Sequence, residues 1–105
     1  TNNEGLLNNT EFTQPALFII SYATAKLYEH YGIIPDESIG HSIGEYVSAC
    51  ISGVFDFETA LKIVIKRGKL MQSVPRGSMM AVRTNVEKLY DIKGSIVEIG
   101  AVNAP

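Results

Sequence analysis

The folds open to this chain are constrained most by five consecutive residues, Gly40-His41-Ser42-Ile43-Gly44. The pattern glycine-x-serine-x-glycine is typical of a sharp turn between a strand and a helix, with the serine hydroxyl exposed at the carboxyl end of a parallel sheet. A Cβ atom at residue 40 or 44 would collide with the adjoining strand or helix. We therefore predict an α/β fold, in which a very short strand over residues 38–40 precedes a helix that ends near residue 52.

Two longer helices are predicted from helix-compatible stretches and from the residues that flank them. The first runs from Gln14 to Tyr31, with Thr13 as its cap and Gly32 after its end. The second runs from residue 57 to about residue 73 and has Asp56 as its cap.

The pattern of predicted elements changes at Pro75-Arg76-Gly77, where we expect a boundary. The part after it holds about 30 residues by the sequence, too few to bury a core of their own. The remaining predicted elements are a loop over 1–12, strands over 78–83 and 96–102, a helix over 86–90 and a turn at 93–94.

Ser42 is the candidate nucleophile. The helix that follows it directs its N-terminal amides and the positive end of its dipole toward the serine, which would stabilise an anionic tetrahedral intermediate. The backbone N–H of Ile43 is the natural first oxyanion donor. The alternative is a tight turn that carries an ordinary surface serine.

The helix predicted over residues 57–73 places an arginine on its inner side. At roughly 100° per residue, Arg67 projects among apolar residues and away from the lysines of the solvated face. A buried guanidinium needs an anionic partner, and its planar fork suits a carboxylate. The alternatives are an ion pair with an Asp or Glu outside these residues or a side chain whose stem alone is buried. The predicted solvated face consists of Lys62, Lys66, Lys69 and Ser73. The predicted inner face consists of Ala60, Val64 and Met71, with Ile63 at its flank.

Neither histidine of the chain is a convincing general base for Ser42. The side chain of His41 leaves the backbone in a different direction from that of its neighbour, and His30 is predicted in the last turn of a helix, where a cation suits the dipole. Cys50, the single cysteine, is predicted to fill space in the core. The spacing of His, Cys, Asp and Glu gives no indication of a metal site.

Charge and hydropathy exclude several other classes of function. Nine Lys and Arg against eleven Asp and Glu give a net charge of −2, which provides no basic surface for nucleic acid. The longest apolar stretch, residues 16–25, is interrupted by polar residues and is shorter than the roughly 20 residues that span a membrane. We expect no membrane association, no signal peptide and a cytoplasmic location. The first residue, Thr1, indicates a piece cut from a longer chain.

The residues that have been singled out are recognisable as a set. The chain resembles the malonyl-CoA:acyl-carrier-protein acyltransferase family, and more closely the acyltransferase domains of modular polyketide synthases than the free-standing enzyme of fatty-acid biosynthesis. The resemblance covers nearly all residues from about 11 onward. The motifs that carry it are Thr13-Gln14-Pro15-Ala16-Leu17, Gly40-His41-Ser42-Ile43-Gly44-Glu45-Tyr46, Arg67-Gly68-Lys69-Leu70-Met71 and Met79-Met80-Ala81-Val82.

The resemblance implies a fold and a set of site residues. Residues 1–75 would form part of an α/β-hydrolase-like large subdomain, and residues 76–105 the start of a ferredoxin-like small subdomain. Ser42 would take an acyl group from CoA as an ester and pass it to the phosphopantetheine thiol of an acyl carrier protein, by ping-pong transfer. The other implied roles are carboxylate binding by Arg67, active-site positions for Gln14, His41 and, less directly, Asn103, and a preference for malonyl-CoA from Ile43, where methylmalonyl-selective relatives often carry glutamine.

The same resemblance places the catalytic histidine outside this chain. We therefore expect the 105 residues by themselves to be inactive. No bound cofactor is expected, and the implied partners are malonyl-CoA, a carrier-protein domain and adjacent synthase domains. Two alternatives stay open: a serine esterase or thioesterase, which uses the same turn, and a structural segment without catalysis.

Overall fold

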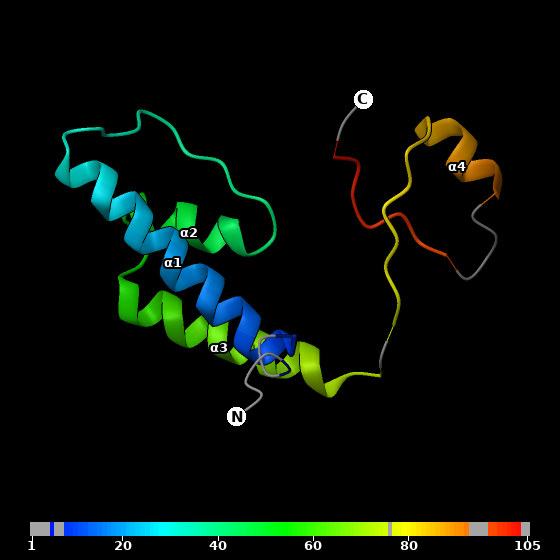
Figure 1. Ribbon diagram of the computed structural model, residues 1–105, viewed down its shortest axis with the longest axis horizontal. Helices are drawn as coiled ribbons and strands as arrows, with labels where there is room; N and C mark the ends of the chain where they lie inside the picture. Colours follow the sequence, from blue (N-terminus) through cyan, green and yellow to red (C-terminus); the bar gives the residue numbers. More distant parts are fainter. Residues whose placement is uncertain (1–4, 6–7, 76, 93–96, 104–105) are drawn as a thin grey trace. The chain divides into compact units, whose positions relative to one another are not determined.

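The computed structural model describes residue 5 and residues 8–75, 77–92 and 97–103. It divides the chain into two compact units, Thr1–Pro75 and Arg76–Pro105. Among the described residues, the first unit contains three helices and the second contains one (Figure 1). These helices are α1 (Thr10–His30), α2 (Ile43–Ile51), α3 (Phe57–Ser73) and α4 (Val86–Ile92).

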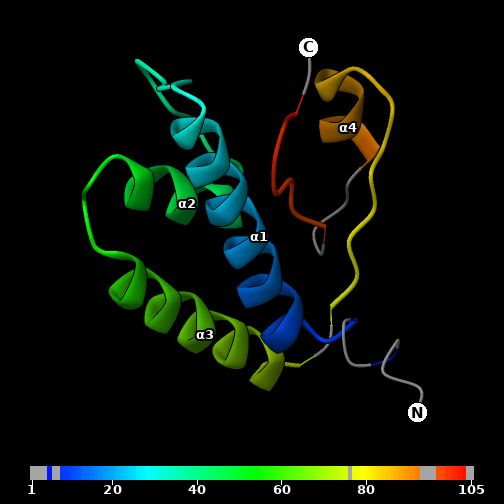
Figure 2. The ribbon, with the colours of Figure 1, turned by 60° about the vertical axis from the view of Figure 1, so that its left-hand side comes forward.

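The core of the first unit lies where α1, α2 and α3 meet, since each pair of these helices is in contact (Figures 1 and 2). Phe18 of α1 and Val64 of α3 are completely buried. The rings of Phe18 and Phe57 stack with their centroids 5.8 Å apart. The ring centroid of Tyr22 lies 4.7 Å from that of Phe57. Burial of these aromatic and branched side chains is the main force that holds the three helices together. The remaining core residues are Val47, Cys50 and Ala60.

A glycine allows α1 to approach α3 closely. Gly68 is buried, and a Cβ atom on it would lie 3.0 Å from the Cα of Glu11 and 3.2 Å from the carbonyl oxygen of Thr10. The neighbouring atoms belong to the backbone of α1, which cannot rotate away as a side chain could. The first turn of α1 therefore rests directly on the backbone of α3.

α1 begins four residues before the predicted start at Gln14, so the predictions of a loop up to residue 12 and of a Thr13 cap are wrong. The N-cap is Asn9, and the Thr13 hydroxyl instead donates to the Asn9 carbonyl at 3.0 Å, as threonines inside helices do. Pro15 is tolerated inside the helix although it lacks an N–H.

Strands are absent from the described residues, so the predicted α/β character is not confirmed there. The segments expected as strands, 38–40, 78–83 and the described part of 96–102, have no regular structure. A strand needs a neighbour to pair its N–H and C=O groups, and no described segment provides one. Ile39 is accordingly 96% exposed. The assignment of the two units to hydrolase-like and ferredoxin-like subdomains stays a prediction, and the turn at 93–94 lies outside the described residues.

The two faces predicted for α3 are largely those observed. The predicted outer residues are exposed, while Ala60 and Val64 are completely buried. The prediction is wrong for Met71, which is 47% exposed, and for Ile63, which is 38% exposed. Both residues line an open hollow in the surface beside α3.

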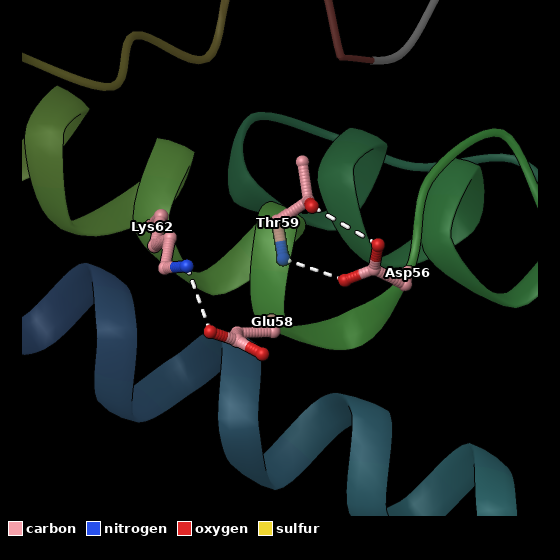
Figure 3. A network of polar contacts seen from close by, with 4 residues as sticks. All are labelled: Asp56, Glu58, Thr59 and Lys62. Atoms are coloured by element: carbon pink, nitrogen blue, oxygen red, sulfur yellow. Dashed lines mark hydrogen bonds and ion pairs between the residues drawn. The ribbon is translucent and has the colours of Figure 1, made fainter.

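Asp56 caps α3, as predicted (Figure 3). Its carboxylate accepts from the backbone N–H of Thr59 at 2.8 Å and from the Thr59 hydroxyl at 3.0 Å. The hydrogen bond from the Thr59 backbone, followed by that from its hydroxyl, holds the pKa of the Asp56 carboxyl below its ordinary value. One turn further on, Lys62 pairs with Glu58 at 2.7 Å.

Replacing Gly68 by alanine should push α1 away from α3. We expect Gly68→Ala to lower the free energy of unfolding by about 1–2 kcal/mol, because the added methyl group overpacks a backbone contact. An ordinary glycine-to-alanine change inside a helix acts in the opposite direction, by about 1 kcal/mol. Thermal or denaturant unfolding of the full-length protein measures the difference. Gly77→Ala, where no atom lies within 4 Å, is the matched control and should leave stability nearly unchanged.

The Asp56 cap makes stability depend on pH. Because the pKa of this carboxyl is lower in the folded chain than in the unfolded one, the cap stabilises fully above the unfolded value and loses its effect as the pH falls below about 4. Asn caps a helix about as well but does not titrate. Between pH 6 and pH 3, the wild type should therefore lose more unfolding free energy than Asp56→Asn does. Parallel losses in the two proteins would contradict this role.

Candidate active site

The backbone is strained at Ser42. Its φ of 53° and ψ of −116° make it the single non-glycine residue with positive φ in the described part of the chain. Residues with a Cβ atom rarely adopt this conformation, and strain of this kind is concentrated at functional sites. Ser42 is the N-cap of α2, yet its hydroxyl makes no capping hydrogen bond, and the residue is exposed. The kink thus presents a hydroxyl that the helix does not use.

The tightness of the turn accounts for one of its two glycines. A Cβ atom on Gly40 would lie 2.2 Å from the carbonyl carbon of Gly44 and 2.3 Å from the nitrogen of Glu45. Any side chain at residue 40 would therefore force the turn open, as predicted from the sequence. The corresponding prediction for Gly44 is wrong within the described residues, because a Cβ atom there would point into open space.

The turn also orients the first amides of α2. The N–H of Gly44 donates to the carbonyl of His41 at 2.9 Å, and that of Glu45 donates to the carbonyl of Ser42 at 3.2 Å. The N–H of Ile43 is at the first helical position, where a helix offers no internal acceptor. Together with the positive end of the helix dipole, this geometry favours negative charge beside Ser42.

Arg67 and Gln14 are in direct contact, although 53 residues separate them in the sequence. The Nη1 atom of Arg67 donates to Oε1 of Gln14, and Nε2 of Gln14 donates to the sulfur of Met71 at 3.1 Å. Gln14 is only 8% exposed, so its amide is held between these two partners. The inward orientation predicted for Arg67 is confirmed by this part-buried contact.

The guanidinium of Arg67 keeps capacity for an anion. Among the described residues the ion pairs are Lys26–Glu29 and Lys62–Glu58, and neither includes Arg67. Its contact is with a neutral amide, which occupies one of the several N–H donors of a guanidinium. Beside Arg67 lies an open hollow of about 320 Å³ that is lined by Ile63, Lys66, Leu70 and Met71.

Tyr46 connects Arg67 to the helix that begins at Ser42. The guanidinium carbon of Arg67 lies 5.8 Å from the centroid of the Tyr46 ring. Tyr46 lies in the first turn of α2, four residues after Ser42. Tyr46 is part of the motif that begins at Gly40, but the sequence alone assigns it no role. Its spacing from Ser42 was the available signal, but only the tertiary structure places it against α3.

The histidines and Asn103 make no hydrogen bond, ion pair or ring contact with Gln14, Tyr46 or Arg67 among the described residues. His41 is exposed beside Ser42, and His30 is exposed at the end of α1 with its ring against that of Tyr31. Asn103 is exposed and belongs to the second unit. Cys50 is buried, as predicted, and burial raises the pKa of its thiol.

The described ranges contain neither a candidate metal site nor a candidate membrane-spanning helix. No group of three or more His, Cys, Asp and Glu side chains there could hold a metal ion. No helix among the same residues is long and apolar enough to cross a membrane.

The strain at Ser42 can be measured by comparing two substitutions that both remove the hydroxyl. Glycine accepts positive φ without penalty, whereas alanine retains the Cβ clash. We expect Ser42→Gly to be more stable to unfolding than Ser42→Ala by about 1–2 kcal/mol. At an ordinary helix N-cap the same pair would differ by a few tenths of a kcal/mol up to about 1. Equal stability of the two variants in the full-length protein would show that the kink stores no strain.

Known proteins are similar to this chain in sequence and in fold. The model of the acyl transferase domain family matches residues 1–105. Mycoketide-CoA synthase of Mycobacterium tuberculosis is 44% identical over 104 residues, which cover 98% of this chain and 2% of that protein. Polyketide synthase GfsA of Streptomyces halstedii is 44% identical over 105 residues, which cover 95% of this chain and 1% of its own length.

A solved structure, described as that of the acyl transferase domain of ZmaA, is similar with a TM-score of 0.75 and 48% sequence identity. The match covers 85% of this chain and 20% of that one. The chain therefore spans a fifth of the solved domain and a very small share of the synthases. A strained serine at a helix start, an arginine facing inward and these matches agree: the chain belongs to the acyl transferase domain family.

Proposed function

We propose that this chain carries the nucleophile and the carboxylate-binding arginine of an acyltransferase that moves a malonyl unit from CoA to a carrier-protein thiol. The observation that carries the proposal is the strained, exposed Ser42 at the start of α2, linked through Tyr46 to an Arg67 that has no carboxylate partner among the described residues. The similarity to polyketide synthases favours polyketide biosynthesis as the setting, with fatty-acid biosynthesis as the related one.

In the first half of the reaction, the Ser42 oxygen attacks the thioester carbonyl of the acyl-CoA. The C–O bond of an ester forms, the C–S bond breaks and CoA leaves. The N–H of Ile43 and the positive end of α2 stabilise the oxyanion of the tetrahedral intermediate. The serine proton goes to a general base, a histidine that we place outside this chain, and the base passes it to the departing CoA thiolate.

In the second half, the phosphopantetheine thiol of an acyl carrier protein attacks the Ser42 ester. A new C–S bond forms, the C–O bond breaks and the serine regains its proton. No cofactor is bound by the acyltransferase, because the carrier brings the phosphopantetheine. A carrier domain and adjacent synthase domains are thus the partners that this function requires.

The preference for malonyl units rests on the surroundings of Arg67. A guanidinium binds a carboxylate with two parallel hydrogen bonds, and Gln14 fixes one edge of the group. Ile43, a branched apolar residue beside the nucleophile, supports malonyl over methylmalonyl units. His41 and Asn103 are assigned to the site by family resemblance.

Hydrolysis is the second candidate, because the same turn serves esterases and thioesterases when water replaces the thiol. The inward Arg67 weighs against a general esterase, which needs no carboxylate-binding group. Product analysis with and without a carrier protein separates the two functions. Rapid release of free malonate that does not depend on the carrier would favour the hydrolase.

A short exposure of the full-length protein to labelled malonyl-CoA should trap a malonyl ester on Ser42. We expect Ser42→Ala to abolish the label, as measured by mass spectrometry of the active-site peptide. Label that persists in this variant would refute the assignment of the nucleophile. Ser73→Ala, which removes an exposed hydroxyl at the end of α3, should leave the labelling unchanged.

Replacing Arg67 by alanine should affect one class of substrate. Loss of a charge-assisted bidentate contact costs about 2–3 kcal/mol, so malonyl transfer should fall by about 30- to 150-fold. Transfer of acetyl groups, which have no free carboxylate, should change little. Equal losses for malonyl and acetyl groups would indicate that Arg67 is purely structural.

A further inference from the structure

The ring of Tyr46 is in a position to orient the guanidinium of Arg67. The 5.8 Å between the guanidinium carbon and the ring centroid is within the range of an attractive cation–π contact. A planar guanidinium on a ring face keeps its N–H edges free to bind a carboxylate. A ring partner therefore differs from an acidic partner, which would occupy the edges that the substrate needs.

Both partners of Arg67 are themselves held in place. Tyr46 is half-buried and packs against the hydrophobic core, next to the buried Val47 on the same helix. Gln14, which accepts from Nη1 of Arg67, is buried and bonded to Met71. The guanidinium is thus held at two points by groups from α1 and α2, while its own backbone belongs to α3.

The hydroxyl of Tyr46 takes no part in this arrangement. None of the hydrogen bonds between the described residues uses it. The interaction between the two residues is that of the guanidinium with the aromatic ring, so the orienting effect of Tyr46 on Arg67 should depend on the ring electrons.

We infer that Tyr46 is a positioning residue that couples the nucleophile helix to the carboxylate-binding arginine and thereby sets the preference for acyl groups with a free carboxylate. Tyr46 lies one helical turn after Ser42, so the ring fixes the guanidinium relative to the helix that carries the nucleophile. The inference rests on the proposed function, because it takes Arg67 as the group that binds the malonyl carboxylate.

The test varies the electrons of the ring and keeps its shape. In the full-length protein, residue 46 is replaced by phenylalanine and by phenylalanines with increasing ring fluorination, each step of which weakens the negative face. The measured quantity is the ratio of kcat/KM for malonyl-CoA to that for acetyl-CoA. Tyr46→Phe should keep the wild-type ratio, and each added fluorine should lower it. Tyr46→Met, which lacks a ring face, should lower it by about 3- to 30-fold.

Controls separate this role from packing and from the proposed function. Tyr31→Met makes the same chemical change on an exposed tyrosine outside the cluster and should leave the ratio unchanged. In an Arg67→Ala background, Tyr46→Met should cause no further change in the ratio. A ratio that is constant across the fluorinated series, while Arg67→Ala abolishes the preference, would overturn the role of Tyr46 and leave the proposed function standing. A preference that survives Arg67→Ala would overturn the proposed function itself.

Discussion

The backbone contact between α1 and α3 at Gly68 is the constraint on which the site depends. It brings the first turn of α1 onto α3 and thereby places Gln14, one turn further along α1, beside Arg67. A side chain at residue 68 would separate the helices, and the amide of Gln14 would lose its contact with the guanidinium. The distance between two backbones thus determines whether the part-buried Arg67 has an oriented neighbour.

The second constraint is the kink before α2. Gly40 makes room for the backbone of Gly44 and Glu45, and this tight passage holds Ser42 at positive φ. The strain has a chemical counterpart, because a serine in an ordinary N-cap conformation would turn its hydroxyl toward the helix amides. Here the hydroxyl makes no capping hydrogen bond, and the N–H of Ile43 has no acceptor within the helix.

The features that were predictable from the sequence are those encoded by neighbouring residues. The Asp56 cap, the extent of α3 and the close approach at Gly40 follow from local patterns, and the structure confirms each of them. The start of α1 was missed because a contact with Gly68, far away in the sequence, stabilises its first turn. The predicted strands depend on partners that the described residues do not contain. Tyr46 was missed because a tyrosine one turn after the serine has no distinctive pattern until α3 packs beside it.

Arg67 and Gly68 are adjacent in α3 but have different structural roles. Arg67 provides a charge on one side of the helix, and Gly68 provides proximity on another side, about 100° around the axis. Substitutions at residue 67 should therefore leave the helix crossing undisturbed, whereas substitutions at residue 68 should not. Under the proposed function, a library that seeks new acyl selectivity should therefore vary Arg67 and Tyr46 and keep Gly68 fixed.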